Sequence, residues 1–248
     1  MQTFQQYLKV AQQAALISGA YLLKNASKPK AIDVKKAHDL KLSIDRFSEK
    51  RIVQYLKKNS PFSILSEEAG TIKGKQEEYN WVVDPLDGTI NYFHQIPFSC
   101  VSIALCRGEI PVLGVIYDFT RDELFTGVEN KGAYLNGRPI KVSQTKFKKQ
   151  AILTTGFPGQ TSLSAENLST FCQYVKTYQK VRLLGSAALS MAYLAAGRVD
   201  AYSEKDIMLW DVAAGIIIVK AAGGHYTIKP TKKTYQYLVS AHNGILGN

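Results

Sequence analysis

Apolar side chains recur at helical spacing in two stretches near the start of the chain. Residues 3–24 form the first amphipathic stretch and residues 44–58 the second, so we expect a helix over each. The segment 25–40 between them is polar and contains Pro29 and several lysines. This composition predicts a loop or a mobile pair of strands that joins the two helices.

Short apolar runs rich in bulky and β-branched residues follow the second helix, and turn residues separate them. Consecutive short strands of this kind form a meander, so we expect an antiparallel sheet packed on the two helices. The expected strands cover residues 62–65, 81–83, 101–105, 111–117 and 123–126, and a hairpin with an Asn-Gly turn covers 134–137.

The second half of the chain alternates between strand patterns and helix patterns. This alternation predicts a smaller layered α/β part, with a boundary near residue 148 that divides the chain into 1–148 and 149–248. The expected fold class is therefore α+β, with a mainly antiparallel sheet and two helices followed by the α/β part. The expected strands cover 151–154, 181–184, 199–202 and 237–240, and the helices cover 166–177, 186–196 and 210–222.

Two carboxylates stand three residues apart at the end of the strand that contains Trp81. Pro85 favours extended backbone at Asp84, and the sequence Asp87-Gly88-Thr89 can turn the chain into a short helix. Carboxylate and carbonyl oxygens suit hard cations such as Mg²⁺, and free N–H groups at a helix start suit a phosphate. The stretch predicts a metal and phosphate site; the alternative is an ordinary surface turn, in which these dipeptides are common.

Two further carboxylates stand at element boundaries. Glu67 follows a short strand, and Asp211 opens an apolar helix, where its alternative role is an N-cap. Gathered in one cleft with the pair at the end of the Trp81 strand, they would repel one another unless cations neutralised them, as in multi-metal phosphoryl-transfer sites. Asp45 lies in the first turn of the second helix, a position that the helix dipole favours for structural reasons alone.

Composition adds a basic character to this picture. The chain has 248 residues, of which 46% are hydrophobic and 21% charged, so it can form a globular core. Lys and Arg exceed Asp and Glu by 31 to 20, and the formal charge of +11 is compatible with nucleic acid or an anionic substrate. The lysine doublets, at 35–36, 57–58, 148–149 and 232–233, are scattered and are not interleaved with aromatic residues. A solvated basic surface is therefore the favoured interpretation.

Cysteine usage and apolar runs bear on the cellular setting. The three cysteines, Cys100, Cys106 and Cys172, are loosely spaced, so we expect buried, reduced thiols in a cytosolic protein. The first residues lack the charge pattern and cleavage site of a secretory signal, and no apolar run approaches the length of about 20 residues that spans a bilayer. We therefore expect a soluble, cytoplasmic protein with no membrane partner.

At these carboxylates the sequence resembles the inositol monophosphatase family, and the resemblance covers nearly the whole chain. Residues 81–89 with Asn91 match the first family signature, and residues 210–215 with 222–224 match the second. The resemblance implies a layered αβαβα sandwich, Mg²⁺ dependence, lithium sensitivity and a homodimer. Two further family blocks are matched by Ser66-Glu67-Glu68 and Gly185-Ser186-Ala187-Ala188.

The resemblance also implies a role for each matching carboxylate. Two or three Mg²⁺ ions would activate the attacking water and neutralise the phosphate. Glu67 would be catalytic as well as a ligand, because it would hold the water-activating ion and lie near a third, weaker one. The implied metal ligands are Glu67, Asp84, the carbonyl of Leu86, Asp87 and Asp211.

Other matching residues would act on the water and the substrate. Thr89, paired with Asp45, would orient and deprotonate the water, because a Thr hydroxyl can relay a proton only with a carboxylate behind it. The N–H groups of Gly88 and Thr89 would bind phosphate. Either Lys35 or Lys36 could supply the cation of the family's mobile loop. The residues that would face the alcohol part of the substrate are Gly185, Ser186, Ala187 and Glu204.

The small phosphomonoester that fits this pattern best is myo-inositol monophosphate. Ile90-Asn91 argues against the nucleotide-bisphosphate branch of the superfamily, and Glu204 can accept hydrogen bonds from ring hydroxyls. Fructose bisphosphate, histidinol phosphate and a nucleotide bisphosphate stay as alternative substrates. A binding function is the second hypothesis, because some bacterial relatives act with RNA polymerase and RNA in transcription antitermination; that role is less favoured and predicts steep salt dependence.

Overall fold

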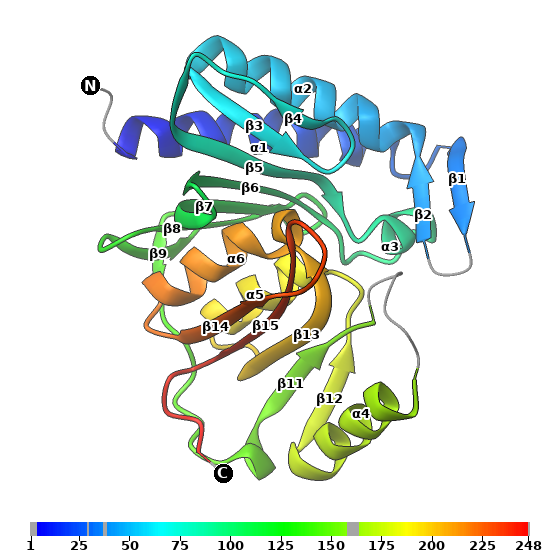
Figure 1. The fold of residues 1–248 in the computed structure, drawn as a ribbon, viewed down its shortest axis with the longest axis vertical. Helices are drawn as coiled ribbons and strands as arrows, with labels where there is room; N and C mark the ends of the chain where they lie inside the picture. The colour runs from blue at the N-terminus through cyan, green and yellow to red at the C-terminus, as the bar shows by residue number, and fades with distance from the viewer. Residues whose placement is uncertain (1–3, 29, 37–38, 158–163, 248) are drawn as a thin grey trace.

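The structure, a computed structural model, describes residues 4–28, 30–36, 39–157 and 164–247, and its elements form five layers (Figure 1). Helices α1 (Phe4–Asn25) and α2 (Ser43–Asn59) cover one face of an eight-stranded sheet. Helices α5 (Ala187–Ala195) and α6 (Leu209–Ala221) lie between this sheet and a five-stranded sheet, and α4 (Ala165–Thr177) lies outside the second sheet. The expected αβαβα sandwich is confirmed.

The eight-stranded sheet has the order β10-β9-β8-β7-β6-β5-β3-β4 and is antiparallel except where β3 pairs with β5. Its central strands are buried along almost their whole length, because helices cover both faces of the sheet. That two-sided burial explains their continuous apolar runs. The strands are β3 (Phe62–Ser66), β4 (Gly70–Ile72), β5 (Gln76–Asp87), β6 (Cys100–Arg107), β7 (Ile110–Asp118), β8 (Glu123–Val128), β9 (Gly132–Leu135) and β10 (Arg138–Ile140).

Two small elements flank this sheet. Strands β1 (Ile32–Lys36) and β2 (Asp39–Leu42) pair antiparallel ahead of α2. Of the two structures expected between the first two helices, a loop or a pair of strands, the pair of strands is confirmed. The short helix α3 (Thr89–Phe93) follows β5 directly, as the turn chemistry of Asp87-Gly88-Thr89 predicts. Both elements lie at the same end of β5 (Figure 1).

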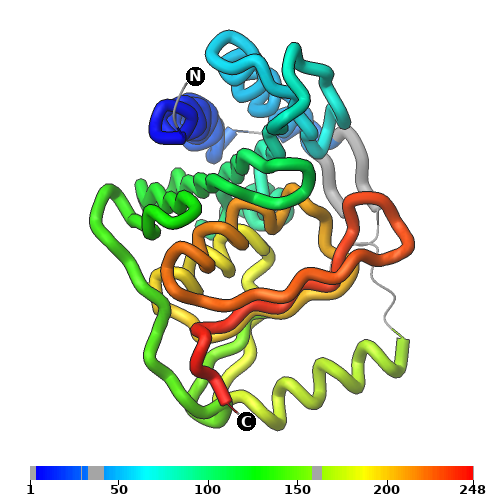
Figure 2. The backbone as a smooth tube through the Cα atoms, turned by 60° about the vertical axis from the view of Figure 1, so that its left-hand side comes forward, coloured from blue at the N-terminus to red at the C-terminus, as the bar shows by residue number. Residues whose placement is uncertain are grey.

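The five-stranded sheet has the order β12-β11-β13-β15-β14, with parallel pairing at β11 and antiparallel pairing at β15. Figure 2 shows it as a separate layer beneath α5 and α6, with α4 on its far side. A 3₁₀ turn, η1 (Lys148–Gln150), leads into it. The strands are β11 (Ile152–Thr155), β12 (Lys180–Leu183), β13 (Ala201–Met208), β14 (His225–Pro230) and β15 (Gln236–His242).

Helix α6 packs unusually close to both of its neighbours. A Cβ atom added to Gly114 of β7 would lie 2.5 Å from the Ala214 carbonyl oxygen, and one added to Gly215 would lie 2.6 Å from Met191 Cβ. Glycine at these positions lets the sheet and α5 approach the α6 backbone. Because it lies between two sheets, α6 is apolar on every side rather than amphipathic.

The structure corrects several details of the sequence analysis. The strand expected at 199–202 is β13, which runs on to Met208, and β4 and β14 were not anticipated. The hairpin with an Asn-Gly turn is confirmed, because β9 and β10 pair antiparallel on either side of Asn136-Gly137. Cys100 and Cys106 are buried free thiols as expected, but Cys172 is exposed on α4, so the expectation was wrong there. In the described part of the chain, no helix is long and apolar enough to cross a membrane. The division at residue 148 stays a prediction.

We predict that Gly114→Ala lowers the free energy of unfolding by about 1–3 kcal/mol, the usual cost of overpacking a core, because α6 must move off β7. Urea unfolding monitored by circular dichroism measures the change. Gly247→Ala is the matched control, since its added Cβ would meet nothing closer than 3.7 Å. Equal stability of the two variants would contradict this account of the packing of α6.

Candidate active site

A bulge at the end of β5 aims two carboxylates the same way. Asp84 pairs with Ser102 of β6 and Asp87 pairs with Cys100. Between these two pairs β5 has two residues and β6 has only one, so β5 carries one extra residue. In a regular strand, residues three apart point to opposite faces, and the extra residue of a bulge reverses that alternation. Asp84 and Asp87 therefore share the face that Cys100 presents to α5 and α6. Both side chains are buried.

Asp87 is fixed by the start of α5. Its Oδ2 atom accepts a hydrogen bond of 2.6 Å from Ser186 Oγ and one of 2.7 Å from the backbone N–H of Ala188. Burial raises the pKa of Asp87 to about 6, and these hydrogen bonds act in the opposite direction because they favour the charged form. Ser186 also caps α5 by accepting from the N–H of Leu189. The predicted substrate contact at Ser186 is thus a side chain already bonded to a predicted metal ligand.

Asp84 is the most buried of the candidate carboxylate ligands, with 1% of its surface exposed. Its Oδ1 atom accepts a hydrogen bond of 2.9 Å from the N–H of Leu86. Burial raises its pKa well above the usual range, and the charges of Glu67, Asp87 and Asp211 raise it further. Four carboxylates from distant parts of the sequence therefore converge on one region, as the sequence analysis expected.

Glu67 reaches this region because β3 runs parallel to β5. Ser66 pairs with Val83, and the N–H of Glu67 donates to the Val83 carbonyl at 3.2 Å, which puts Glu67 beside Asp84. The turn after Glu67 is fastened by Glu49 of α2, whose Oε1 accepts from Ser66 Oγ and from the N–H groups of Glu68 and Ala69. Glu49 is thus a positioning residue for Glu67.

The sequence analysis missed Glu49. It is buried on the face of α2 that also carries Asp45 and Ile52, which lie one helical turn before it and one after it. A glutamate one turn after Asp45, on the face that buries Ile52, was the signal that could have found it. Ser48 on the same helix donates a hydrogen bond of 2.8 Å to the carbonyl of Pro85, between the two aspartates of β5.

Asp211 lies in the first turn of α6, where its Oδ2 accepts from the N–H of Met208 at 3.1 Å. This bond satisfies one of the free donors at the helix start. Asp211 is the third residue of α6 and the N-cap is Met208, so the N-cap alternative is wrong in position, although the Asp211 carboxylate does cap the backbone N–H of Met208. Burial raises the pKa of Asp211 well above its usual range, and the charges of Glu67, Asp87 and Glu204 raise it further. The same carboxylate both caps α6 and faces the other candidate ligands.

Thr89 and Asp45 begin two different helices beside this cluster. The Thr89 hydroxyl donates to the carbonyl of Leu86 at 3.0 Å, and Asp45 Oδ2 accepts from the N–H of Leu42 at 2.8 Å. The hydrogen bond of Thr89 is thus to the predicted carbonyl ligand, and its pairing with Asp45 stays a prediction. Gly88 has a φ of 85°, a left-handed conformation that favours glycine.

Asn91 joins the two halves of the site, although the sequence analysis gave it no role. Its Nδ2 donates to the carbonyls of Phe98 and Leu184, both at 2.8 Å. Gly185 packs on this amide, because an added Cβ would lie 2.9 Å from Asn91 Nδ2. The segment that leads into α5 is therefore held directly against the segment around α3.

Glu204 comes from β13 on the second sheet and is buried, with 9% of its surface exposed. Burial raises its pKa to about 8, and the charge of Asp87 adds to the effect. Gly156 lies against it, since an added Cβ would approach Glu204 Oε1 to 2.5 Å. Glycine at 156 therefore leaves the space that the Glu204 carboxyl occupies. Lys35 and Lys36 belong to β1, and the choice between them stays open because their side chains lie outside the described set.

The donor set has the chemistry of a site for hard cations: four carboxylates and a strand-end carbonyl, with carboxylate charges raising the pKa values of Asp84 and Asp211. Within the described residues, no three Asp, Glu, His or Cys side chains form a group that could hold a metal ion as they stand. The carboxylates are nevertheless close enough for their charges to raise one another's pKa values, as at Asp84 and Asp211.

Comparison with known proteins agrees with this geometry. An inositol-1-monophosphatase of Synechocystis is 41% identical over 223 residues, which cover 89% of this chain and 78% of that protein. A protein named Nus factor SuhB from Pasteurella multocida is 37% identical over 240 residues, covering 95% and 89%. The solved inositol monophosphatase of Anabaena superposes with a TM-score of 0.83 at 39% identity, covering 98% of this chain and 92% of that one.

The sequence profile described as the inositol monophosphatase family matches residues 4–248, which include every candidate ligand. The five layers, the converging carboxylates and the similarity to solved members agree with that match. The chain belongs to the inositol monophosphatase family.

Proposed function

We propose that this protein is a Mg²⁺-dependent phosphatase that hydrolyses a small phosphomonoester, with myo-inositol monophosphate as its substrate. The observation that carries the proposal is the convergence of Glu67, Asp87 and Asp211 on the buried Asp84, whose pKa their charges raise. Negative charges gathered away from water need cations to neutralise them. A phosphate ester brings further negative charge, which only a cation-loaded site can accept.

The residues that would hold two or three Mg²⁺ ions are Glu67, Asp84, the Leu86 carbonyl, Asp87 and Asp211. Bound there, such ions supply a water of lowered pKa and stabilise charge on the phosphate and the leaving oxygen. The protein contributes the orientation of its oxygens. Asp84 and Asp211 each accept a backbone N–H, at Leu86 and Met208, and these bonds restrain one oxygen of each carboxylate.

Thr89 and the neighbouring N–H groups act on the reacting phosphate. We assign the N–H groups of Gly88 and Thr89 to the phosphate oxygens, since both adjoin Asp87 at the end of β5. The Thr89 hydroxyl orients the attacking water. For Thr89 to take a proton from that water, its own proton must pass to an acceptor, the role that we assign to Asp45.

The alcohol part of the substrate is assigned to the wall formed by the second half of the chain, where Gly185, Ser186, Ala187 and Glu204 lie. Glu204 is a buried carboxyl group on this wall, and its oxygens can accept hydrogen bonds from ring hydroxyls. A polyol offers such hydroxyls, which is why inositol monophosphate is favoured over simpler esters. Asn91 of α3 holds this wall in place, because its side-chain amide donates a hydrogen bond to the Leu184 carbonyl.

We predict that Asp84→Asn lowers phosphate release from inositol 1-phosphate by at least about a hundredfold, the cost of losing one main electrostatic group from an active site. Removal of Mg²⁺ with EDTA should abolish the wild-type rate. Glu77→Gln, on the exposed start of the same strand, is the matched control. A panel with fructose bisphosphate, histidinol phosphate and a nucleotide bisphosphate tests the substrate; full turnover by metal-stripped protein would contradict the proposal.

We predict that Glu204→Ala and Gly156→Ala both lower kcat/KM for inositol 1-phosphate by about tenfold or more while nearly sparing p-nitrophenyl phosphate. The first variant removes the carboxyl group that meets ring hydroxyls, and the second displaces it through the 2.5 Å contact. Steady-state phosphate release on both substrates measures the split. An equal loss on both substrates would assign Glu204 to the catalytic core instead.

We predict that Glu204→Gln stabilises the metal-free protein increasingly as the pH rises. The folded pKa of about 8 exceeds the unfolded value of about 4.3, so folding keeps a proton that the unfolded chain releases. The contribution of Glu204 to wild-type stability is therefore full below about pH 4 and falls by up to about 1.4 kcal/mol per pH unit towards pH 8. The glutamine variant lacks this loss.

Urea unfolding in EDTA at pH 5 and pH 8.5 measures the difference. Glu166→Gln, which replaces an exposed glutamate on α4, is the control and should track the wild type at both pH values. If the stability difference between Glu204→Gln and the wild type is the same at both pH values, the prediction is contradicted. Glu204 would then be charged in the folded protein at neutral pH, as it is in the unfolded chain.

A further inference from the structure

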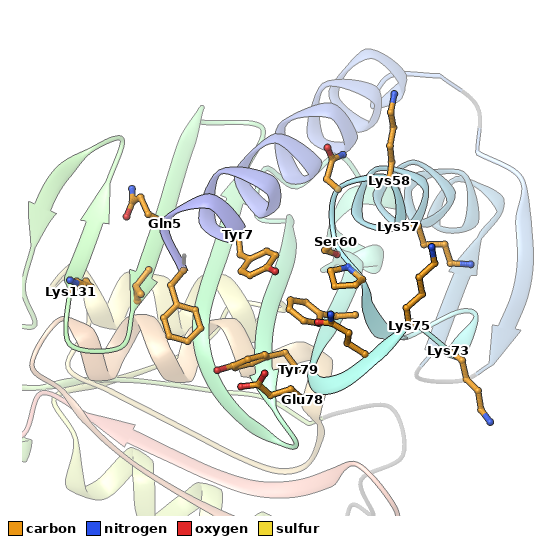
Figure 3. Close-up of a pocket in the computed structure, with 17 residues that line it drawn as sticks. Gln5, Tyr7, Lys57, Lys58, Ser60, Lys73, Lys75, Glu78, Tyr79 and Lys131 are labelled. Carbon is orange, nitrogen blue, oxygen red and sulfur yellow. The ribbon is translucent and has the colours of Figure 1, made fainter. Parts of the chain in front are cut away.

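A groove of about 1480 Å³ lies at the ends of α2, β3 and β5 opposite to the active site. Its lining comes from the start of α1, the end of α2, the β4–β5 connection and the β8–β9 turn (Figure 3). Five lysines, Lys57, Lys58, Lys73, Lys75 and Lys131, contribute to it. The proposed phosphatase activity makes no use of these residues.

The charge of the groove is almost entirely positive and is not neutralised by the protein. Glu78 is the one carboxylate among the described lining residues, against the five lysines. In the described part of the chain, the ion pairs of Arg198, Lys220 and Arg121 lie elsewhere, and none includes a lysine of the groove. Unpaired ammonium groups around one hollow attract a polyanion.

Aromatic rings form the floor between the lysines. Tyr7 packs on Phe62 at 4.9 Å between ring centroids, and Phe62 packs on Tyr79 at 5.4 Å. Tyr7 and Tyr79 are partly exposed, and Arg107 binds the Tyr79 hydroxyl at 2.8 Å. Figure 3 shows Tyr7 and Tyr79 between Lys131 on one side and Lys57, Lys73 and Lys75 on the other.

We propose that this groove binds single-stranded nucleic acid, with phosphates along the lysines and unpaired bases against the Tyr7 and Tyr79 rings. Proteins that bind single strands combine a cationic track with aromatic platforms in this way. A duplex keeps its bases stacked inside and gains nothing from the rings. A single small anion would leave most of the groove unfilled, because small-molecule pockets rarely exceed about 1,000 Å³.

The groove and the active site lie at opposite ends of the same strands. Tyr79 and Asp84 both belong to β5, five residues apart, which corresponds to about 17 Å along a strand. Phe62 opens β3 at the groove, and Ser66 closes it beside the carboxylates. Nucleic acid bound in the groove would therefore leave the carboxylate region accessible, and the two activities can be tested separately.

Fluorescence anisotropy with a labelled 12-nucleotide oligo(U) tests the proposal in EDTA at several salt concentrations. Wild-type protein should bind with an affinity that falls steeply as salt rises. Lys73→Glu combined with Lys75→Glu should weaken binding at least tenfold and reduce the salt slope by about two. Phosphate release and the thermal midpoint of the same variant should stay at wild-type values.

Two controls separate the groove from general basicity. Lys146→Glu with Lys149→Glu removes the same charge from exposed positions at the other end of the molecule and should leave binding unchanged. An abasic strand of equal length should bind at least fivefold more weakly than oligo(U), because it lacks bases to stack. Equal losses in both double variants, no binding of oligo(U), or binding of polyglutamate in its place would each overturn the proposal.

Discussion

The candidate site depends on one electrostatic constraint, the mutual repulsion of buried and half-buried carboxylates at the ends of several elements. Each of the three aspartates is restrained by a backbone donor: Leu86 N–H for Asp84, Ala188 N–H for Asp87 and Met208 N–H for Asp211. These bonds offset part of the cost of burial, and the rest appears as raised pKa values. The bulge in β5 turns Asp84 and Asp87 to one face, and the starts of α5 and α6 supply the hydrogen bonds to Asp87 and Asp211.

The residues of the site were predictable where local sequence carries the signal. The pair Asp84 and Asp87 could be predicted because an apolar strand ends abruptly in Asp84-Pro85-Leu86-Asp87. Asp211 could be predicted because it stands at the start of an apolar helix. Glu49 and Asn91 were not predictable in the same way, because their partners lie far along the chain at Ala69 and Leu184. Their roles emerge only when the sheet and the helices are in contact.

The elements missed in the fold have a related cause. Strand β14 alternates exposed and half-buried residues with no fully buried position, so its pattern lacks a clear apolar face. The lysines of the groove could not be grouped from the sequence either. Lys58, Lys75 and Lys131 are far apart along the chain, but the fold brings them to one groove. Their scatter favoured the interpretation of a general basic surface, since linear spacing does not report the parallel pairing of β3 and β5.

The bond between Ser186 and Asp87 means that the candidate site cannot be complete until the second half of the chain has been synthesised. Asp87 lies in the first half of the sequence, but its donors begin with α5, and Asp211 follows still later. A nascent chain that has completed only the first sheet has a solvent-exposed pair of aspartates without these partners. Because Asp87 takes its donors from the start of α5 and Asp211 belongs to α6, a chain that ends after the first sheet carries only part of the candidate ligand set.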